Sequence, residues 1–267
     1  MGNCWLVCAL SVLAEIPGAL QRILLTKEHN PAGAYQVRLC RSGEWHTITI
    51  DDTFPTIGRD FLAYLKAARR SLWGPLIEKA AAKLWGSYEA LAGGNFAEAF
   101  NMLTGFPVER ISIAALKVPK MRAVPPGAAA HPADQVEGFE RYVQHWHEEH
   151  PEGEEGGLQD LYGKLVSFRC DGFAIGASTQ IQPDDALYAE ARSKGIQCAH
   201  AYGVLDVRYV SFNEEEVALV KLRNPNGVGL WTGSWSRGDT THWTYEMKQE
   251  LEPDNEDQGE SYTKKLY

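Results

Sequence analysis

Three residues far apart in the chain have side chains that could together perform nucleophilic catalysis: Cys4, His200 and Asn224. Cys4 stands at the predicted start of an apolar helix, where the positive end of the helix dipole makes a thiol easier to ionise. A histidine can take the thiol proton and later protonate a leaving amine, and an asparagine oxygen can orient the imidazole. The three side chains therefore predict acyl transfer through a thioester intermediate.

The order of these residues relative to the predicted strands strengthens this interpretation. His200 lies just before a predicted strand over 203–210, and Asn224 follows the next predicted strand over 217–222. If the two strands pair in antiparallel fashion, His200 and Asn224 lie at the same end of the sheet. A lone cysteine is more often a small buried apolar residue, as we expect for Cys8 one turn after Cys4. The ordered set, rather than Cys4 alone, carries the prediction.

The first hundred residues are predicted to be mainly helical, with one β-hairpin. The first helix is apolar on nearly every face, which is typical of a buried helix, and Pro17-Gly18 would end it. Apolar and polar residues alternate beside Ser42-Gly43, which indicates a hairpin turn, and apolar spacings of three and four residues predict later helices. The predicted elements are helices over 4–16, 72–91 and 96–103 and hairpin strands over 34–39 and 45–50.

The rest of the chain changes character twice. Residues 117–157 are rich in proline and glutamate, which indicates a surface insertion with a short helix near 139–147. From Val166 onward the sequence is β-rich, and its last fifteen residues are charged and expected to fray. The predicted strands cover 173–176, 203–210 and 217–222. A helical half followed by a β half predicts an α+β fold of two lobes, over 1–105 and 106–267, facing each other across a cleft.

Composition excludes several classes of function. The 267 residues carry a net charge of −9, and nucleic-acid binding needs clustered Lys and Arg, so we expect no nucleic-acid partner. A hydrophobic content of 44% excludes disorder across the whole chain. The sequence contains no apolar run of about 18 residues or more, so it predicts no membrane span. Five cysteines, without a secretory signal or a CxxC pair, predict free thiols in a reducing, cytoplasmic compartment and exclude a zinc ribbon.

Several motifs, in order, resemble the catalytic core of calpains, the papain-like intracellular cysteine proteases. The similarity covers about residues 2–106 and 166–243, with the insertion outside it. The segment Leu103-Thr104-Gly105-Phe106-Pro107 is most similar to calpain-like proteins of unicellular parasites. The matching segments are Gly2-Asn3-Cys4-Trp5-Leu6, Gly43-Glu44-Trp45, Asp51-Asp52-x-x-Pro55-Thr56, Leu72-Trp73-x-x-Leu76-Ile77-Glu78-Lys79-Ala80-x-Ala82-Lys83, Tyr88-Glu89-Ala90-Leu91-x-Gly93-Gly94, Thr104-Gly105, His200-Ala201-Tyr202, Arg223-Asn224-Pro225 and Trp231-Thr232-Gly233-x-Trp235.

The resemblance implies a role for each candidate residue. Cys4 would be the nucleophile that attacks a peptide carbonyl, and its N–H would contribute to the oxyanion hole. His200 would act as general base and then as general acid, and Asn224 would hold the productive tautomer. The family implies a two-lobed papain-like fold, protein substrates cut at limited sites, and no organic cofactor. It leaves open flanking domains and regulatory protein partners.

Three departures from the family pattern concern the oxyanion hole and the nucleophile. The family places an oxyanion-hole glutamine six positions before the catalytic cysteine, and that position falls before Met1. We therefore expect this chain to be N-terminally truncated relative to its full gene product. Asn3 replaces the family aspartate beside the nucleophile, and Asn226 replaces a tryptophan that shields the triad hydrogen bond.

The positions that correspond to calcium ligands in the family do not suit a hard cation. Calcium prefers carboxylate and carbonyl oxygens. The corresponding positions here hold Ser71, Leu230 and Arg237. We expect that the chain has no family-type calcium site and requires no metal.

Two other functions stay open beside the protease. An incomplete oxyanion hole could leave a catalytically impaired scaffold that binds protein partners. A transglutaminase-like thiol acyltransferase would pair Cys and His with Asp, and Asn224 counts against it. The segment His145-Trp146-His147-Glu148-Glu149-His150 could suggest a metal site, but it lacks the HExxH spacing, and we interpret it as an exposed, charged part of the insertion.

Overall fold

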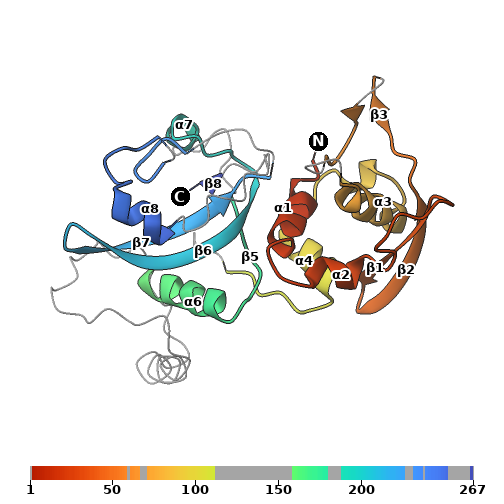
Figure 1. Cartoon of the computed structure of the whole chain (residues 1–267), viewed down its shortest axis with the longest axis horizontal. Helices are drawn as coiled ribbons and strands as arrows, with labels where there is room; N and C mark the ends of the chain where they lie inside the picture. Colours follow the sequence, from red (N-terminus) through yellow and green to blue (C-terminus); the bar gives the residue numbers. More distant parts are fainter. Residues whose placement is uncertain are drawn as a thin grey trace. The chain divides into compact units, whose positions relative to one another are not determined.

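The computed structural model (Figure 1) describes residues 2–58, 61–66, 71–111, 158–179, 188–225, 231–236, 238–251 and 265–266. Two compact units can be distinguished. The first comprises Met1–Glu109, Ala174–Asp206 and Val220–Tyr267, and the second Arg110–Phe173 and Val207–Leu219. The predicted insertion over 117–157, with its helix near 139–147 and the His145–His150 segment, lies outside the described residues. The predicted lobe boundary near residue 105 stays a prediction.

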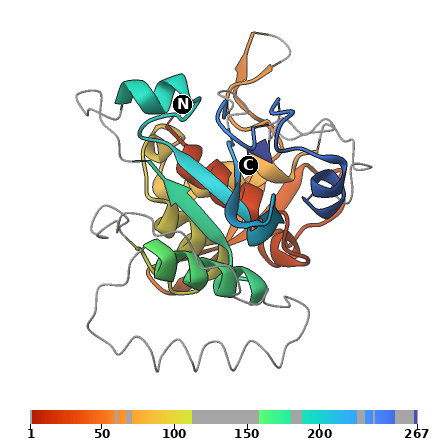
Figure 2. The ribbon, with the colours of Figure 1, turned by 90° about the vertical axis from the view of Figure 1, so that its left-hand side faces the viewer.

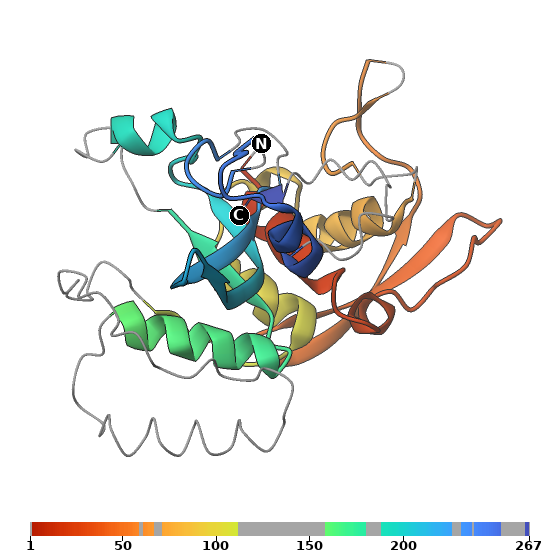
Figure 3. The same ribbon diagram turned by 60° about the vertical axis from the view of Figure 1, so that its left-hand side comes forward.

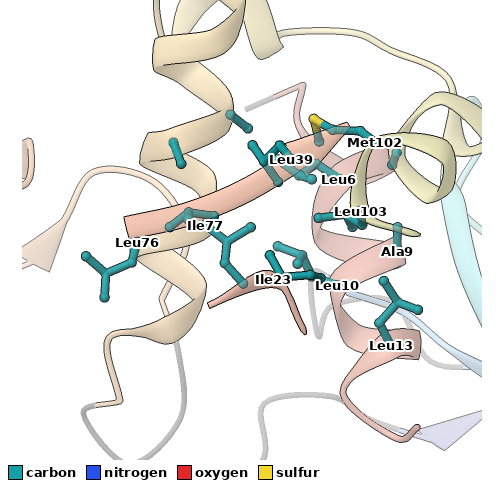
Figure 4. Close-up of a cluster of buried hydrophobic side chains, with 14 of the residues drawn as sticks. Leu6, Ala9, Leu10, Leu13, Ile23, Leu39, Leu76, Ile77, Met102 and Leu103 are labelled. Carbon is teal, nitrogen blue, oxygen red and sulfur yellow. The ribbon is translucent and has the colours of Figure 1, made fainter. Parts of the chain in front are cut away.

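The first unit is organised around α1 (Cys4–Leu13), a helix with seven buried residues. Because it is apolar on almost every face, other elements must surround it. The helix ends three residues before the predicted end, and Gly18 then adopts a left-handed φ of 77° before the short α2 (Ala19–Ile23), which sequence periodicity did not predict. Figure 4 shows α1 side chains meeting residues from β1, α3 and α4 in one core.

The predicted hairpin is confirmed as β1 (Ala34–Arg41) and β2 (Glu44–Asp51). The two strands pair in antiparallel register from Ala34 opposite Asp51 to Arg41 opposite Glu44. Ser42 and Gly43 form the two-residue turn, and both have positive φ, 54° and 82°, as a type I′ turn requires. Alternate β1 residues are buried, which matches the predicted pattern.

The predicted helical region over 72–91 divides at Gly86, whose φ of 108° no helix can contain. It yields α3 (Trp73–Trp85) and the 3₁₀ turn η2 (Glu89–Leu91). The next helix, α4 (Phe96–Thr104), is confirmed and ends at Gly105. A small antiparallel pair, β3 (Thr56–Ile57) and β4 (Phe61–Leu62), was too short to be predicted.

The β-rich part forms a four-stranded sheet in the order β5-β6-β7-β8. Strand β5 begins two residues later than predicted, and the strands predicted over 203–210 and 217–222 are confirmed inside longer ones. Asn213 and Glu214, both with positive φ, connect β6 to β7. The remaining elements are β5 (Ile175–Ser178), α7 (Tyr188–Ser193), β6 (Ala201–Phe212), β7 (Glu215–Arg223), α8 (Tyr245–Leu251) and β8 (Lys265–Leu266).

Helix α6 (Leu158–Cys170) corrects one prediction, because residues 166–170 are helical and not the start of the β-rich region. Apolar residues at 158, 161, 165 and 168 have helical spacing, which identifies the helix in the sequence. The hydroxyl oxygen of Tyr162 lies 2.6 Å and 2.7 Å from the carbonyl oxygens of Arg208 and Leu219. Figures 2 and 3 show α6 running beside β6, the strand that carries Arg208, and the Leu219 contact lies on β7.

These observations confirm the predicted α+β class, with helices and antiparallel sheets in one chain. Within the described ranges, no helix has the length and apolarity that crossing a bilayer requires.

Candidate active site

The N-terminal end of α1 is held by the segment that follows α3. The N–H of Gly93 donates to the carbonyl of Gly2 at 2.7 Å, and the indole N–H of Trp5 donates to the carbonyl of Leu91 at 2.9 Å. A Cβ on Gly94 would lie 2.3 Å from the Trp5 ring, so only glycine permits this close approach. The segment over 88–94 therefore contacts residues on both sides of Cys4.

Cys4 is the first residue of α1 and is partly exposed. The carbonyl of Asn3 starts the helix by accepting from the N–H groups of Leu6 and Val7, each at 3.1 Å. Because Cys4 begins the helix, its thiol lies at the end where the dipole favours negative charge. This is the position that the sequence predicted.

His200 and Asn224 are brought together by the sheet. His200 immediately precedes β6 and is 6% exposed, and Asn224 immediately follows β7 and is 1% exposed. The Nε2 atom of His200 lies 2.9 Å from Oδ1 of Asn224. Since the asparagine oxygen can only accept, Nε2 carries the proton in this contact. The other ring nitrogen, Nδ1, is left for Cys4.

Backbone and ring contacts fix the orientation of His200. The N–H of His200 donates to Oγ1 of Thr179 at 3.1 Å, and its carbonyl accepts from the N–H of Thr179 at 2.9 Å. The ring of Tyr202 packs edge-on against the imidazole with centroids 5.0 Å apart. Ala199, with a positive φ of 49°, turns the chain into β6 at this point. The imidazole therefore has little freedom to leave Asn224.

The electrostatics of Cys4 and His200 favour charge separation between them. A hydrogen bond with His200 lowers the pKa of Cys4, which burial alone would raise, and the N–H groups of Ala201 and Trp5 lower it further. Burial tends to lower the pKa of His200, but hydrogen bonds with Cys4 and Asn224 outweigh burial and raise it. Opposite shifts in two adjacent groups favour a thiolate beside an imidazolium.

Cys8 provides an internal comparison one helical turn away. Its side chain is 0% exposed, and burial raises its pKa well above the usual value. The prediction that Cys8 is a small buried residue is confirmed. None of the five cysteines forms a disulfide.

Sequence reasoning missed the role of Arg223, the residue before Asn224. Its guanidinium is buried and donates from Nη1 to the carbonyl of Ser11 at 3.1 Å, and Nη2 lies 2.5 Å from a carboxylate oxygen of Glu15. Both partners lie near the C-terminal end of α1. Arg223 thus connects the strand that ends at Asn224 with the helix that begins at Cys4, and only its position beside Asn224 in the motif could have drawn attention to it.

Gly203 allows β6 to approach the same helix. A Cβ at this position would lie 2.7 Å from Cγ2 of Val12 and 3.8 Å from Sγ of Cys8. A larger residue would therefore push the start of β6, which follows His200, away from α1.

No metal centre accompanies these groups in the part of the chain that the structure describes, where three His, Cys, Asp or Glu side chains never converge. Ser71 lies within the described residues, just before α3, and offers no carboxylate. Leu230 and Arg237 lie outside them. The expectation that the chain lacks family-type calcium ligation stays a prediction.

Comparison with curated proteins gives relatives along almost the whole chain. It is 32% identical over 254 residues to the calpain-type cysteine protease ADL1 of Oryza sativa subsp. japonica, which covers 94% of this chain and 10% of the rice protein. It is 31% identical to mouse calpain-5, over 94% of this chain and 37% of calpain-5. It is also 31% identical to human calpain-8, over 96% of this chain and 31% of calpain-8. The chain thus spans about a tenth of the plant relatives and about a third of the animal ones.

A family comparison agrees with these relatives. The sequence model described as calpain family cysteine protease matches residues 1–265, which is nearly the entire chain. The resemblance inferred from the motifs is confirmed, and the chain belongs to the calpain family of cysteine proteases.

Proposed function

We propose that this chain is the catalytic core of a calpain-type endopeptidase, with Cys4 as nucleophile, His200 as acid–base and Asn224 as the group that orients His200. The single observation that carries the proposal is the position of the His200 ring, which bonds Asn224 at 2.9 Å and shares a hydrogen bond with Cys4. A buried histidine between a thiol at a helix start and an amide oxygen is the arrangement that thiol proteolysis requires.

The first half of the reaction is acylation. The Cys4 thiolate attacks the peptide carbonyl carbon, an S–C bond forms, and the carbonyl oxygen becomes an oxyanion that the Cys4 N–H can stabilise. The His200 imidazolium then gives its proton to the amide nitrogen, the C–N bond breaks, and the amine product leaves. The acyl group remains on Cys4 as a thioester.

The second half is hydrolysis of the thioester. His200, now neutral, takes a proton from a water molecule that attacks the acyl carbon. The S–C bond breaks, the carboxylic acid leaves, and the proton returns to the Cys4–His200 pair. Asn224 keeps the imidazole in one tautomer throughout by accepting from Nε2.

The proposal extends to conditions and partners. The substrates are polypeptides, because the reaction that the site supports is attack on a peptide carbonyl. Five free cysteines support a reducing, intracellular location. Ser71, in place of a carboxylate, supports activity without calcium.

Labelling with an epoxysuccinyl thiol probe, read by intact mass, tests the proposal directly. We expect one adduct on the wild-type chain, none on Cys4→Ser, and an unchanged adduct on Cys8→Ser. The adduct should persist in a calcium chelator. A folded wild-type chain that remains unlabelled would contradict the proposal and favour a non-catalytic scaffold, and a reversible requirement for calcium would contradict its metal-free part.

A further inference from the structure

Helix α3 carries a buried carboxylate that contacts the residue before Cys4. Glu78 is 2% exposed, although glutamate is almost always at the surface. Its Oε1 atom accepts from the side-chain amide of Asn3 at 2.5 Å, and its Oε2 atom accepts from the backbone N–H of Leu65 at 2.9 Å. Both oxygens are therefore used, and one of them holds the residue that immediately precedes Cys4.

The contact with Glu78 determines what the Asn3 side chain does. Asparagine at the residue before a helix is among the best N-caps, because its side-chain oxygen accepts from a first-turn N–H group. Asn3 makes no such bond, and its backbone, with φ −97° and ψ 16°, is not the extended form that capping uses. Its amide is turned toward Glu78 instead.

The N–H of Leu6 donates to the Asn3 carbonyl, but the N–H of Trp5 is consequently left for another acceptor. The pKa of Cys4 is lowered chiefly by the hydrogen bond with His200, and the backbone N–H groups of Ala201 and Trp5 lower it further. Trp5 is the second helical residue, and an N-cap side chain bonds the N–H of the second or third. A capping Asn3 would therefore compete with the thiolate for the same donor.

Burial, hydrogen-bond donors and two tyrosine rings surround the Glu78 carboxyl. Burial raises the pKa of Glu78, while the donors from Leu65 and Asn3 act in the opposite direction. The titratable groups that face it are Tyr88 and Tyr64, whose rings stack with centroids 4.3 Å apart. Pro75, from the first turn of α3, lines the same small cavity as Glu78 and the two tyrosines. These groups surround the Glu78 carboxylate.

We propose that Glu78 is a positioning residue for Cys4: by holding the amide of Asn3 away from α1, it keeps the N–H of Trp5 free for the Cys4 thiolate. The inference rests on the proposed role of Cys4 as nucleophile. It assigns to the glutamate of the Ile77-Glu78-Lys79 segment a function in catalysis rather than in helix stability alone.

The test is the pH dependence of Cys4 alkylation by iodoacetamide, followed by intact mass on the folded chain. In Glu78→Ala the freed Asn3 side chain can cap α1, so we expect the alkylation midpoint to rise and the rate near neutral pH to fall about three- to tenfold. The exposed Glu98 of α4 provides the matched control, and Glu98→Ala should leave the midpoint unchanged.

The double variant separates positioning from simple loss of structure. Asn3→Ala/Glu78→Ala has no side chain at position 3 that could cap α1. Its alkylation midpoint should therefore return to the wild-type value, although it loses both side chains of the contact. Asn3→Ala alone should also keep the wild-type midpoint. If Glu78→Ala does not fold, Glu78→Leu takes its place, because it keeps a similar volume but has no atom that can accept from the Asn3 amide.

The outcomes distinguish this inference from the proposed function. An unchanged midpoint in folded Glu78→Ala or Glu78→Leu, or a shift that persists in the double variant, would overturn the role of Glu78 while the wild-type thiol stays reactive. A wild-type Cys4 that alkylates only at the pH of an ordinary thiol would instead overturn the proposed function.

Discussion

Two helices of the first unit follow an asparagine, and they use it in opposite ways. Before α4, Asn95 has φ −106° and ψ 132°, and its side-chain oxygen accepts from the N–H of Ala97 at 2.9 Å. Before α1, Asn3 turns its side chain to Glu78 and leaves the helix start uncapped. The same residue type thus caps one helix with its side chain and leaves the start of the other without a side-chain cap, beside the thiol that we propose as nucleophile.

The difference has a physical cost and a local explanation. A capping bond contributes about 1 kcal/mol to stability, and α1 forgoes it. The loss is tolerated because α1 is held by the core, with seven buried residues, and by the bonds of its flanking residues to Leu91 and Gly93. No cysteine lies at the start of α4 that an uncapped first turn could affect. Tertiary contacts therefore decide how a local signal is used.

The largest expected effect separates the first turn of α1 from its second. Cys4→Ala should reduce peptide hydrolysis and probe labelling to background, because Cys4 is the thiol that hydrogen-bonds His200. Cys8→Ala removes a buried sulfur and should lower the free energy of unfolding by about 1 kcal/mol, with labelling retained. Labelling and thermal unfolding of both variants would check this. Equal loss of labelling in two folded variants would contradict the assignment.

The next effect concerns the group behind the imidazole. Asn224→Ala removes the acceptor for His200 Nε2 and should lower kcat about 10²- to 10⁴-fold. The hydrogen bond with Asn224 helps to raise the pKa of His200. Its loss should lower that pKa, so the imidazolium deprotonates earlier and the alkaline limb of the pH–rate profile moves to lower pH. A profile measured from pH 5 to 10 tests this, and an alkaline limb that stays in place would argue against the orienting role.

A smaller effect is expected from the connection between β7 and α1. Arg223→Met keeps a long buried side chain but loses the bonds to Ser11 and Glu15, and should lower the free energy of unfolding by about 2 kcal/mol. Glu15→Gln removes only the half-exposed partner and should cost less than about 1 kcal/mol. Denaturant unfolding of the two variants measures the difference. A larger loss in Glu15→Gln than in Arg223→Met would show that Arg223 does not carry the connection.

The sequence predicted the parts of the site that depend on local order. Cys4, His200 and Asn224 could be found because each has a chemical type and a fixed place beside a helix or strand. The β1–β2 hairpin could be found because alternation and a two-residue turn are local signals. Elements of two to five residues, such as α2 and β3, carry too little periodicity to be predicted.

Glu78 and Arg223 could not be assigned for a different reason. Charged residues are expected at the surface, and nothing within several residues of either one shows that it is buried. An asparagine before a helix is usually an N-cap. The Asn3 side chain instead bonds Glu78, 75 residues later. The residues that we propose to position the site depend on contacts distant in sequence, whereas the residues that we propose to react carry their own chemical signal.

The smallest expected effect sharpens the comparison of the two asparagines most directly. Asn95→Ala should lower the free energy of unfolding by about 1 kcal/mol, and Asn95→Ser, which can still cap, should restore most of it. Neither should change the pH midpoint of Cys4 alkylation. At position 3 the same serine substitution should raise the pH midpoint of Cys4 alkylation, because a serine there can cap α1 but is too short to keep the contact with Glu78. Denaturant unfolding and alkylation of the four variants, with Asn3→Ala as the fourth, would show whether the two helix starts differ as the contacts indicate. A shift in the alkylation midpoint of Asn95→Ala, or none in Asn3→Ser, would mean that capping does not control the thiol.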